Sequence, residues 1–322
     1  MLKKIATITS MGVATSYLYA EIVEKRSYKS FLYEMLLRVT KMKRAFEKAT
    51  YAQEALEAVK HQTQGKYEGT DYHFENTVYT KMIQNVTTYV VNDKEDNQQR
   101  SLIYVHGGAW FQNPLKYHFE YIDKLATAFN AKVIMPIYPK IPHATYKETF
   151  ELLEAIYRNE LGQKVNAQKL TIIGDSAGGQ IALSFAQYLK TVNLTQPSDI
   201  VLISPVLDGT LSHPEARVYE KIDPMLGIEG SKYLINLWAD KLPLTDWRVS
   251  PIYGDFNGLG RITISIGTKE TLYPDAVKLS QMLNEQGIQH SFIPGYQLFH
   301  IHPIFPIPER EQLIHKLKEI ID

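Results

Sequence analysis

The sequence predicts an α/β protein in which helices flank a mostly parallel central sheet. From about residue 70 to the end of the chain, short apolar runs alternate with longer stretches of helical periodicity. Strands that alternate with helices of roughly 10–15 residues form βαβ units and parallel sheets. Glycine-rich motifs follow two of these runs directly. Because ligand sites in parallel sheets lie beyond the carboxyl ends of the strands, the residues just after the strands are the candidates for function.

The elements can be assigned in order along the chain. Residues 28–61 repeat apolar side chains at three- and four-residue spacing and predict a helix, and residues 64–69 predict a loop. The predicted strands cover 73–82, 85–92, 101–105, 132–138, 170–174, 200–204, 261–267 and 290–294. The predicted helices cover 117–129, 146–161, 179–190, 231–241, 273–286 and 308–321. The helix at 231–241 interrupts the alternation and is expected to be an insertion.

The chain is expected to divide into three parts. Residues 28–69 would form a helical cap region, and residues 70–322 would form the α/β domain. Residues 1–27 are ambiguous, because two lysines precede an uncharged run at 5–20, as in a signal peptide or a membrane anchor. Five serines and threonines dilute that run, so an ordinary N-terminal helix is the alternative. The first interpretation predicts an exported or membrane-associated protein, and the second, which the dilution favours, predicts a cytoplasmic one.

The composition excludes several classes of function. The 322 residues include 35 basic and 35 acidic side chains, so the net charge is zero, whereas a nucleic-acid-binding protein would carry a basic excess. Cysteine is absent, which removes disulfides, thiolate nucleophiles, zinc–thiolate sites and iron–sulfur clusters. The sequence also lacks a phosphate loop and the His-Glu-x-x-His zinc motif. We therefore expect no metal, no cofactor and no nucleic-acid partner, and a small molecule as the ligand.

The segment Leu-Thr-Ile-Ile-Gly-Asp-Ser-Ala-Gly-Gly at 170–179 carries the clearest chemical signal. Gly174, Ser176 and Gly178 form a G-x-S-x-G motif between an apolar strand and an apolar helix, which is the setting of a nucleophile elbow. Such a turn would point the Ser176 hydroxyl into the crevice. The alternative is a serine that only caps an ordinary helix. A dinucleotide-binding loop would need glycine where Ser176 stands.

The segment Tyr-Val-His-Gly-Gly-Ala-Trp at 104–110 follows an earlier predicted strand. Attack on a carbonyl creates an oxyanion, which preorganised N–H groups stabilise. The N–H groups of Gly107, Gly108 and Ala177 are expected to form this oxyanion hole. The alternative is a plain glycine turn, but both motifs occur at strand ends and in the order that the chemistry needs, which favours the oxyanion hole.

Together these motifs resemble a known family. The His-Gly-Gly run at 106–108 and the Gly-Asp-Ser-Ala-Gly-Gly run at 174–179 are similar to those of the hormone-sensitive-lipase-like branch of the α/β-hydrolases, which are bacterial carboxylesterases and lipases. Residues 138–143, 204–208 and 223–226 resemble further segments of that branch. The resemblance implies an α/β-hydrolase fold from the third predicted strand to the C-terminus and, loosely, a helical cap before it. His-Gly-Gly-Ala-Trp also resembles arylformamidases, so an amide or formamide substrate is an alternative to an ester.

In this fold the acid and then the histidine follow the serine along the chain. His300 is the preferred base, because the five residues that it ends resemble the family's segment that leads to its catalytic histidine, and His302 is the alternative. Glu270 is the preferred acid, because it follows a predicted strand at the family's spacing. Asp275 is the alternative acid, although an acidic residue at that point also suits the start of a helix. Geometry must choose within each pair.

These residues predict ester hydrolysis by a triad of serine, histidine and glutamate, with short- to medium-chain carboxylic esters as substrates. Trp110, Phe111 and Tyr138 are expected near the crevice, either as pocket lining or as core. Apolar residues of the predicted cap helix, such as Met35 and Leu36, would cover the crevice or pack as core. A non-catalytic binding protein on the same scaffold is the remaining alternative.

Overall fold

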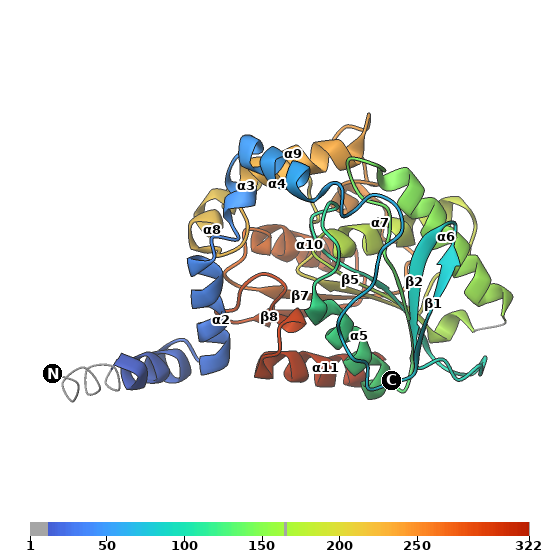
Figure 1. Ribbon diagram of the computed structural model, residues 1–322, viewed down its shortest axis with the longest axis horizontal. Helices are drawn as coiled ribbons and strands as arrows, with labels where there is room; N and C mark the ends of the chain where they lie inside the picture. The colour runs from blue at the N-terminus through green and yellow to red at the C-terminus, as the bar shows by residue number, and fades with distance from the viewer. Residues whose placement is uncertain (1–11, 164–165, 322) are drawn as a thin grey trace.

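The computed structural model describes residues 12–163 and 166–321, which form one eight-stranded sheet with helices around it (Figure 1). The strand order is β1-β2-β4-β3-β5-β6-β7-β8. The strands are β1 (Val78–Ile83), β2 (Val86–Val91), β3 (Ser101–Val105), β4 (Lys132–Pro136), β5 (Leu170–Asp175), β6 (Asp199–Ile203), β7 (Arg261–Gly267) and β8 (His290–Gly295). The β1–β2 and β2–β4 pairs are antiparallel and all other pairs are parallel, so the predicted fold class is confirmed.

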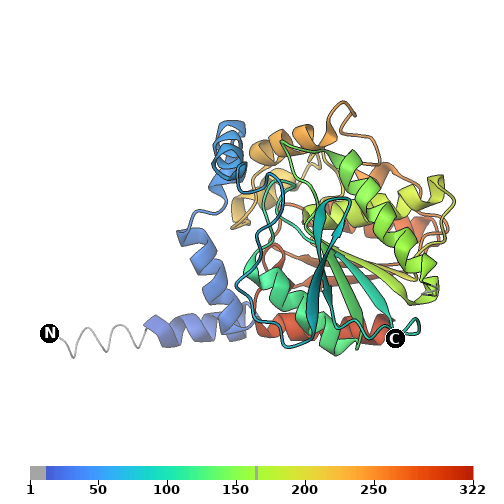
Figure 2. The ribbon, with the colours of Figure 1, turned by 45° about the vertical axis from the view of Figure 1, so that its right-hand side comes forward.

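The helices cover both faces of this sheet. They are α2 (Tyr28–Val39), α3 (Arg44–Glu47), α4 (Ala49–Val59), α5 (Lys116–Ala128), α6 (Tyr146–Gly162), α7 (Ala177–Thr191), α8 (Ala216–Ile222), α9 (Ile228–Ala239), α10 (Tyr273–Glu285) and α11 (Pro308–Ile321). Helices α5 and α11 lie on one face, and α6, α7 and α10 lie on the other (Figures 1 and 2). Above the sheet, α3 and α4 pack against α9, which is the helix that the sequence predicts as an insertion.

The central strands are covered on both sides. Every residue of β3, β5 and β6 is buried, which explains why their sequences are continuous apolar runs and not alternating ones. Because these strands are parallel, their carboxyl ends meet at one edge of the sheet. The loops after β3, β5, β7 and β8 therefore come together there, and they carry the candidate residues.

The N-terminal part differs from the prediction of one helix over 28–61. The structure has three helices there, because Lys41 takes a positive φ of 54° and Lys48 is extended at φ −140° and ψ 148°. No glycine or proline marks either turn, and the apolar periodicity of the sequence continues through both. The sequence therefore carries no signal for these two breaks. Helix α8 is a further element that the sequence analysis does not predict.

The first described residues lead outward from the rest of the protein. A helix that ends in a π-helical turn, η1 (Tyr19–Val23), extends to one side of the sheet domain (Figures 1 and 2). The signal or anchor interpretation of residues 1–20 lies partly outside the described residues, which begin at residue 12. No helix in the described part of the chain is long and apolar enough to cross a membrane.

Candidate active site

Ser176 stands on a sharp turn between β5 and α7. Its backbone has φ 53° and ψ −119°, a region that costs a residue with a side chain about 1–3 kcal/mol. The turn is possible because glycines flank it. A Cβ atom on Gly178 would lie 2.0 Å from the Val105 carbonyl oxygen, and a Cβ on Gly174 would lie 2.2 Å from the Gly178 carbonyl oxygen. The strand, turn and helix thus have the arrangement of a nucleophile elbow.

The structure brings Ser176, His300 and Glu270 into one hydrogen-bonded chain. Nε2 of His300 lies 2.9 Å from the Ser176 hydroxyl oxygen, and Nδ1 of His300 lies 2.7 Å from Oε2 of Glu270. All three side chains are buried, and Ser176 retains 8% of its surface. The three residues follow β5, β8 and β7 respectively. The serine therefore has a base within reach, and the base has an orienting carboxylate.

The carboxylate of Glu270 is held by two groups, neither of which has a role predicted from the sequence. Its Oε1 atom accepts hydrogen bonds from the Ser204 hydroxyl at 2.7 Å and from the Gly267 N–H at 2.5 Å. The Ser204 oxygen in turn accepts from the Ile301 N–H at 3.0 Å, which connects the acid to the loop of the histidine. The signal for Ser204 was its position at the end of the neighbouring strand β6.

The surroundings of His300 and Glu270 shift the pKa of both side chains upward. Burial alone would lower the pKa of His300, but the carboxylates of Glu270, Asp223 and Asp175 raise it above its usual value. Burial raises the pKa of Glu270, and the contact with His300 opposes this increase. The carboxylates around His300 therefore stabilise a positive charge on this ring.

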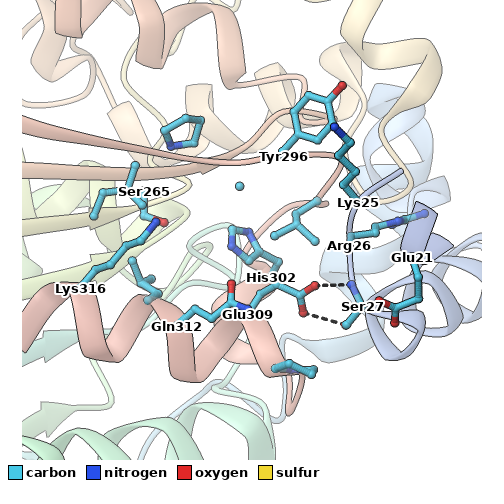
Figure 3. Close-up of a pocket in the computed structure, with 16 residues that line it drawn as sticks. Glu21, Lys25, Arg26, Ser27, Ser265, Tyr296, His302, Glu309, Gln312 and Lys316 are labelled. Atoms are coloured by element: carbon cyan, nitrogen blue, oxygen red, sulfur yellow. Dashed lines mark hydrogen bonds between the residues drawn. The ribbon is translucent and has the colours of Figure 1, made fainter. Parts of the chain in front are cut away.

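The two alternative residues lie elsewhere. Asp275 is buried in the first turn of α10, where burial and the nearby Asp208 raise its pKa to about 7, and it makes no hydrogen bond to either His300 or His302. His302 begins the short helix η4 (His302–Ile304) and lines a different cavity, which also contains Glu309 (Figure 3). Burial lowers the pKa of His302 to about 3, so this ring is neutral.

One of the expected oxyanion-hole groups is occupied. The Gly107 N–H donates to Oδ1 of Asp175 at 2.9 Å, so it does not point a free N–H group at an oxyanion, contrary to the prediction from the sequence. That carboxylate also accepts a hydrogen bond from the Tyr104 hydroxyl at 2.7 Å and thereby braces the glycine loop against the elbow. The N–H groups of Gly108, in the loop after β3, and of Ala177, at the start of α7, have no hydrogen-bond partner among the described residues.

A narrow, mostly apolar cavity adjoins Ser176. Its volume is about 20 Å³, enough for about one water molecule. It is lined by Phe46, Ala109, Trp110, Ser176, Val206, Leu211, Leu226, Gly227, Ser231, Ile235, Thr271 and Leu272.

Of the three aromatic residues expected near the crevice, only Trp110 lines this cavity, where its indole N–H donates to Gln180 at 3.0 Å. Phe111 is fully buried core, and the Tyr138 hydroxyl donates to the His106 carbonyl at 3.0 Å behind the loop. Both side chains are turned into the domain by the loops that follow β3 and β4. A lining residue that the sequence analysis missed is Phe46, which comes from α3. Among the described residues no group of three or more His, Asp or Glu side chains could hold a metal ion.

Comparison with known proteins identifies the relatives of this chain. The model of a family described as having the alpha/beta hydrolase fold matches residues 102–302, a segment that contains the glycine loop and all three residues of the hydrogen-bonded chain. An esterase from Acinetobacter venetianus is 31% identical over 59% of this chain, which spans 63% of that relative's length. An acetyl-hydrolase from Streptomyces hygroscopicus is 29% identical over 64% of this chain and 71% of its own length.

Among solved structures, a candidate esterase from Staphylococcus aureus superimposes with a TM-score of 0.82 and 26% identity. The superposition covers 88% of this chain and 96% of that one. The family match extends over more than half of the chain, and it includes the elbow, the glycine loop, Glu270 and His300. The chain therefore belongs to the α/β-hydrolase-fold family.

Proposed function

We propose that this protein is a serine carboxylesterase, which hydrolyses short- to medium-chain carboxylic esters through an acyl-enzyme. The observation that carries the proposal is the buried chain from Ser176 through His300 to Glu270, with contacts of 2.9 and 2.7 Å. A serine that only capped a helix would need neither a base on its hydroxyl nor a strained backbone. The relatives described above are an esterase and an acetyl-hydrolase, which favours an ester over an amide or formamide substrate.

The reaction proceeds in two steps. His300 takes the hydroxyl proton as Ser176 Oγ attacks the ester carbonyl, and Glu270 stabilises the imidazolium that forms. The N–H groups of Gly108 and Ala177 stabilise the oxyanion, and the positive end of the α7 dipole adds to them. The imidazolium then protonates the leaving alcohol, and water, activated by the same imidazole, hydrolyses the acyl-enzyme.

The cavity beside Ser176 supports an acyl pocket for small groups. Its volume of about 20 Å³ admits a methyl group, and a longer chain has to displace the side chains around it. Phe46 closes this cavity from the N-terminal helices, because α3 packs on α9 and the Gly227 and Gly230 backbones lie directly against Phe46. We assign residues 28–69 the role of a cap over the active site on this basis.

A fluorophosphonate probe and nitrophenyl esters test the proposal. The wild-type protein is expected to be labelled covalently and to hydrolyse nitrophenyl acetate, and Ser176→Ala is expected to lose labelling and to lower kcat by about 10⁶-fold. Ser231→Ala is the matched control, because Ser231 lines the same cavity but donates its hydroxyl to the Gly227 carbonyl. Ester hydrolysis that survives in Ser176→Ala, or labelling that is lost only in Ser231→Ala, would contradict the assignment.

A further inference from the structure

Helix α2 turns its apolar side outward. Leu32, Met35, Leu36 and Val39 repeat at helical spacing, and 48%, 44%, 54% and 74% of their surfaces are exposed. The opposite face is buried and carries the carboxylate of Glu34. In a helix on the surface of a water-soluble domain the arrangement is normally the reverse.

Ion pairs hold the helix in this orientation. Glu34 lies 2.5 Å from Arg26, 2.7 Å from Arg38 and 3.1 Å from Lys269, which follows β7 in the main domain. The start of the helix is also anchored, because Glu309 of α11 accepts hydrogen bonds from the N–H and the hydroxyl of Ser27 at 2.7 and 2.9 Å (Figure 3). The outward side chains are therefore presented by a fixed helix.

Further exposed apolar side chains precede and follow α2 in the chain. We use the name N-terminal apolar face for its exposed side chains, which are Val13, Tyr17, Leu18, Tyr19, Ile22, Val23, Leu32, Met35, Leu36, Val39 and Met42. Their exposed fractions lie between 38% and 74%. They belong to one continuous stretch of chain, in which the helix before α2 projects from the domain and α2 lies along its side (Figures 1 and 2). Exposed apolar surfaces of this extent usually mark an interaction site.

Basic side chains adjoin this face. A hollow of about 620 Å³ opens at the end of α2, where Leu37 lines it, and its lining includes five cationic and only two anionic side chains. The cationic ones are Arg38, Lys41, Lys43, Arg44 and Lys221. Lys41 and Lys221 form no ion pair within the described chain. The first 50 residues contain ten lysines and arginines and four glutamates, although the whole chain is neutral.

We propose that the N-terminal apolar face and the basic hollow together dock this protein on an anionic membrane surface. The apolar side chains enter the boundary between headgroups and acyl chains, and the hollow receives lipid phosphates. A second copy of the chain is a poor occupant, because pairing two such faces would bring two cationic hollows together. An anionic lipid surface offers acyl chains to the N-terminal apolar face and phosphates to the basic hollow.

The docking surface is directly connected to the cap. Only six residues separate Val39, on the exposed face, from Phe46, which lines the cavity beside Ser176. Docking would thus place the cap next to the membrane, from which apolar esters could enter. This consequence rests on the proposed esterase function, whereas the docking itself does not.

Vesicle sedimentation with the full-length protein tests the inference. One set of vesicles contains phosphatidylcholine alone, and the other contains equal parts of phosphatidylcholine and phosphatidylglycerol. The wild type is expected to sediment with the second set and less so at high salt. Leu36→Glu combined with Val39→Glu should lower the partition coefficient at least tenfold. Lys41→Glu combined with Lys221→Glu should lower the partition coefficient roughly fivefold or more for each lysine replaced, since each basic residue contributes about 1 kcal/mol to binding of an anionic membrane.

Met82→Glu is the matched control, because Met82 is 49% exposed on β1, at the sheet edge opposite to β8. The Met82→Glu variant should bind the vesicles as the wild type does. Thermal unfolding shows that each variant is folded, so the result of this test does not depend on the proposed function. Equal binding to both vesicle sets would overturn the inference, and so would unchanged binding of the Leu36 and Val39 variant. Lipid-free dimerisation that this variant abolishes would overturn it as well.

Discussion

Nε2 of His300 lies 2.9 Å from Oγ of Ser176, although 124 residues separate the two in the chain. The serine follows β5 and the histidine follows β8, with β6 and β7 between these strands in the sheet. Because β5 to β8 are parallel, both residues leave the sheet at the same edge. The loop after β8 then crosses back over the ends of β6 and β7, where Ser204 and Glu270 hold it.

The choice of acid can be tested by two amide substitutions. Glu270→Gln should lower kcat by about 10³–10⁴-fold, because the imidazole loses the carboxylate that orients it and stabilises its charged form. Asp275→Asn should leave kcat unchanged, because Asp275 has no contact with His300. Steady-state hydrolysis of nitrophenyl acetate measures both variants. A larger loss in Asp275→Asn than in Glu270→Gln would assign the acid to Asp275.

The activity should depend on pH through His300. The imidazole must be neutral to accept the serine proton, and the surrounding carboxylates raise its pKa above the ordinary 6.5. Activity is therefore lost as the pH falls through this raised value, so the acidic limb of kcat/KM should have an apparent pKa above 6.5. In Glu270→Gln the limb of the residual activity should move to lower pH. A wild-type limb below 6.5 would contradict this account of the site.

The acyl pocket can be enlarged at α9. Ile235 lines the cavity beside Ser176, and Ile235→Ala should raise the kcat/KM ratio of butyrate to acetate esters by about tenfold, since pocket methylene groups are worth about 1–3 kcal/mol each.

Leu234→Ala is the control for this change, because Leu234 is equally buried on α9 but does not line the cavity. Both variants should lose about 2–5 kcal/mol of stability in urea unfolding, and only the first should change the ratio. An equal shift of the ratio in both variants would show that helix packing, and not pocket volume, sets the preference.

The elbow should tolerate no side chain at Gly178. A Cβ there would lie 2.0 Å from the Val105 carbonyl oxygen, so Gly178→Ala should abolish activity and lower the free energy of unfolding by at least about 1–3 kcal/mol. Gly162→Ala, where nothing lies within 4 Å of the added atom, should instead stabilise the protein by about 0.4–1 kcal/mol. Thermal unfolding of both variants provides the measurement. Equal stability changes would show that the turn relaxes around the methyl group.

Much of the fold could be predicted because its signals are local. Strands 101–105 and 261–267 and helix 308–321 have the predicted bounds, since their burial produces a regular apolar pattern. The breaks at Lys41 and Lys48 could not be predicted in this way, because they follow from packing of α3 and α4 on α9 and not from a residue that stops helices. Met35 and Leu36 were expected to cover the crevice or to pack in the core, but they face outward. Periodicity shows which residues share one face of a helix, but not what that face contacts.

By itself the sequence determined the α/β class, the serine on its elbow and the absence of any thiol nucleophile, because each of these depends on a short segment or on composition. Only the tertiary structure placed His300, and not His302, beside Ser176, and directed the Gly107 N–H to Asp175. These outcomes depend on contacts between segments that are far apart in the chain. Such contacts arise when the sheet brings the ends of separate strands together, and no local pattern records them.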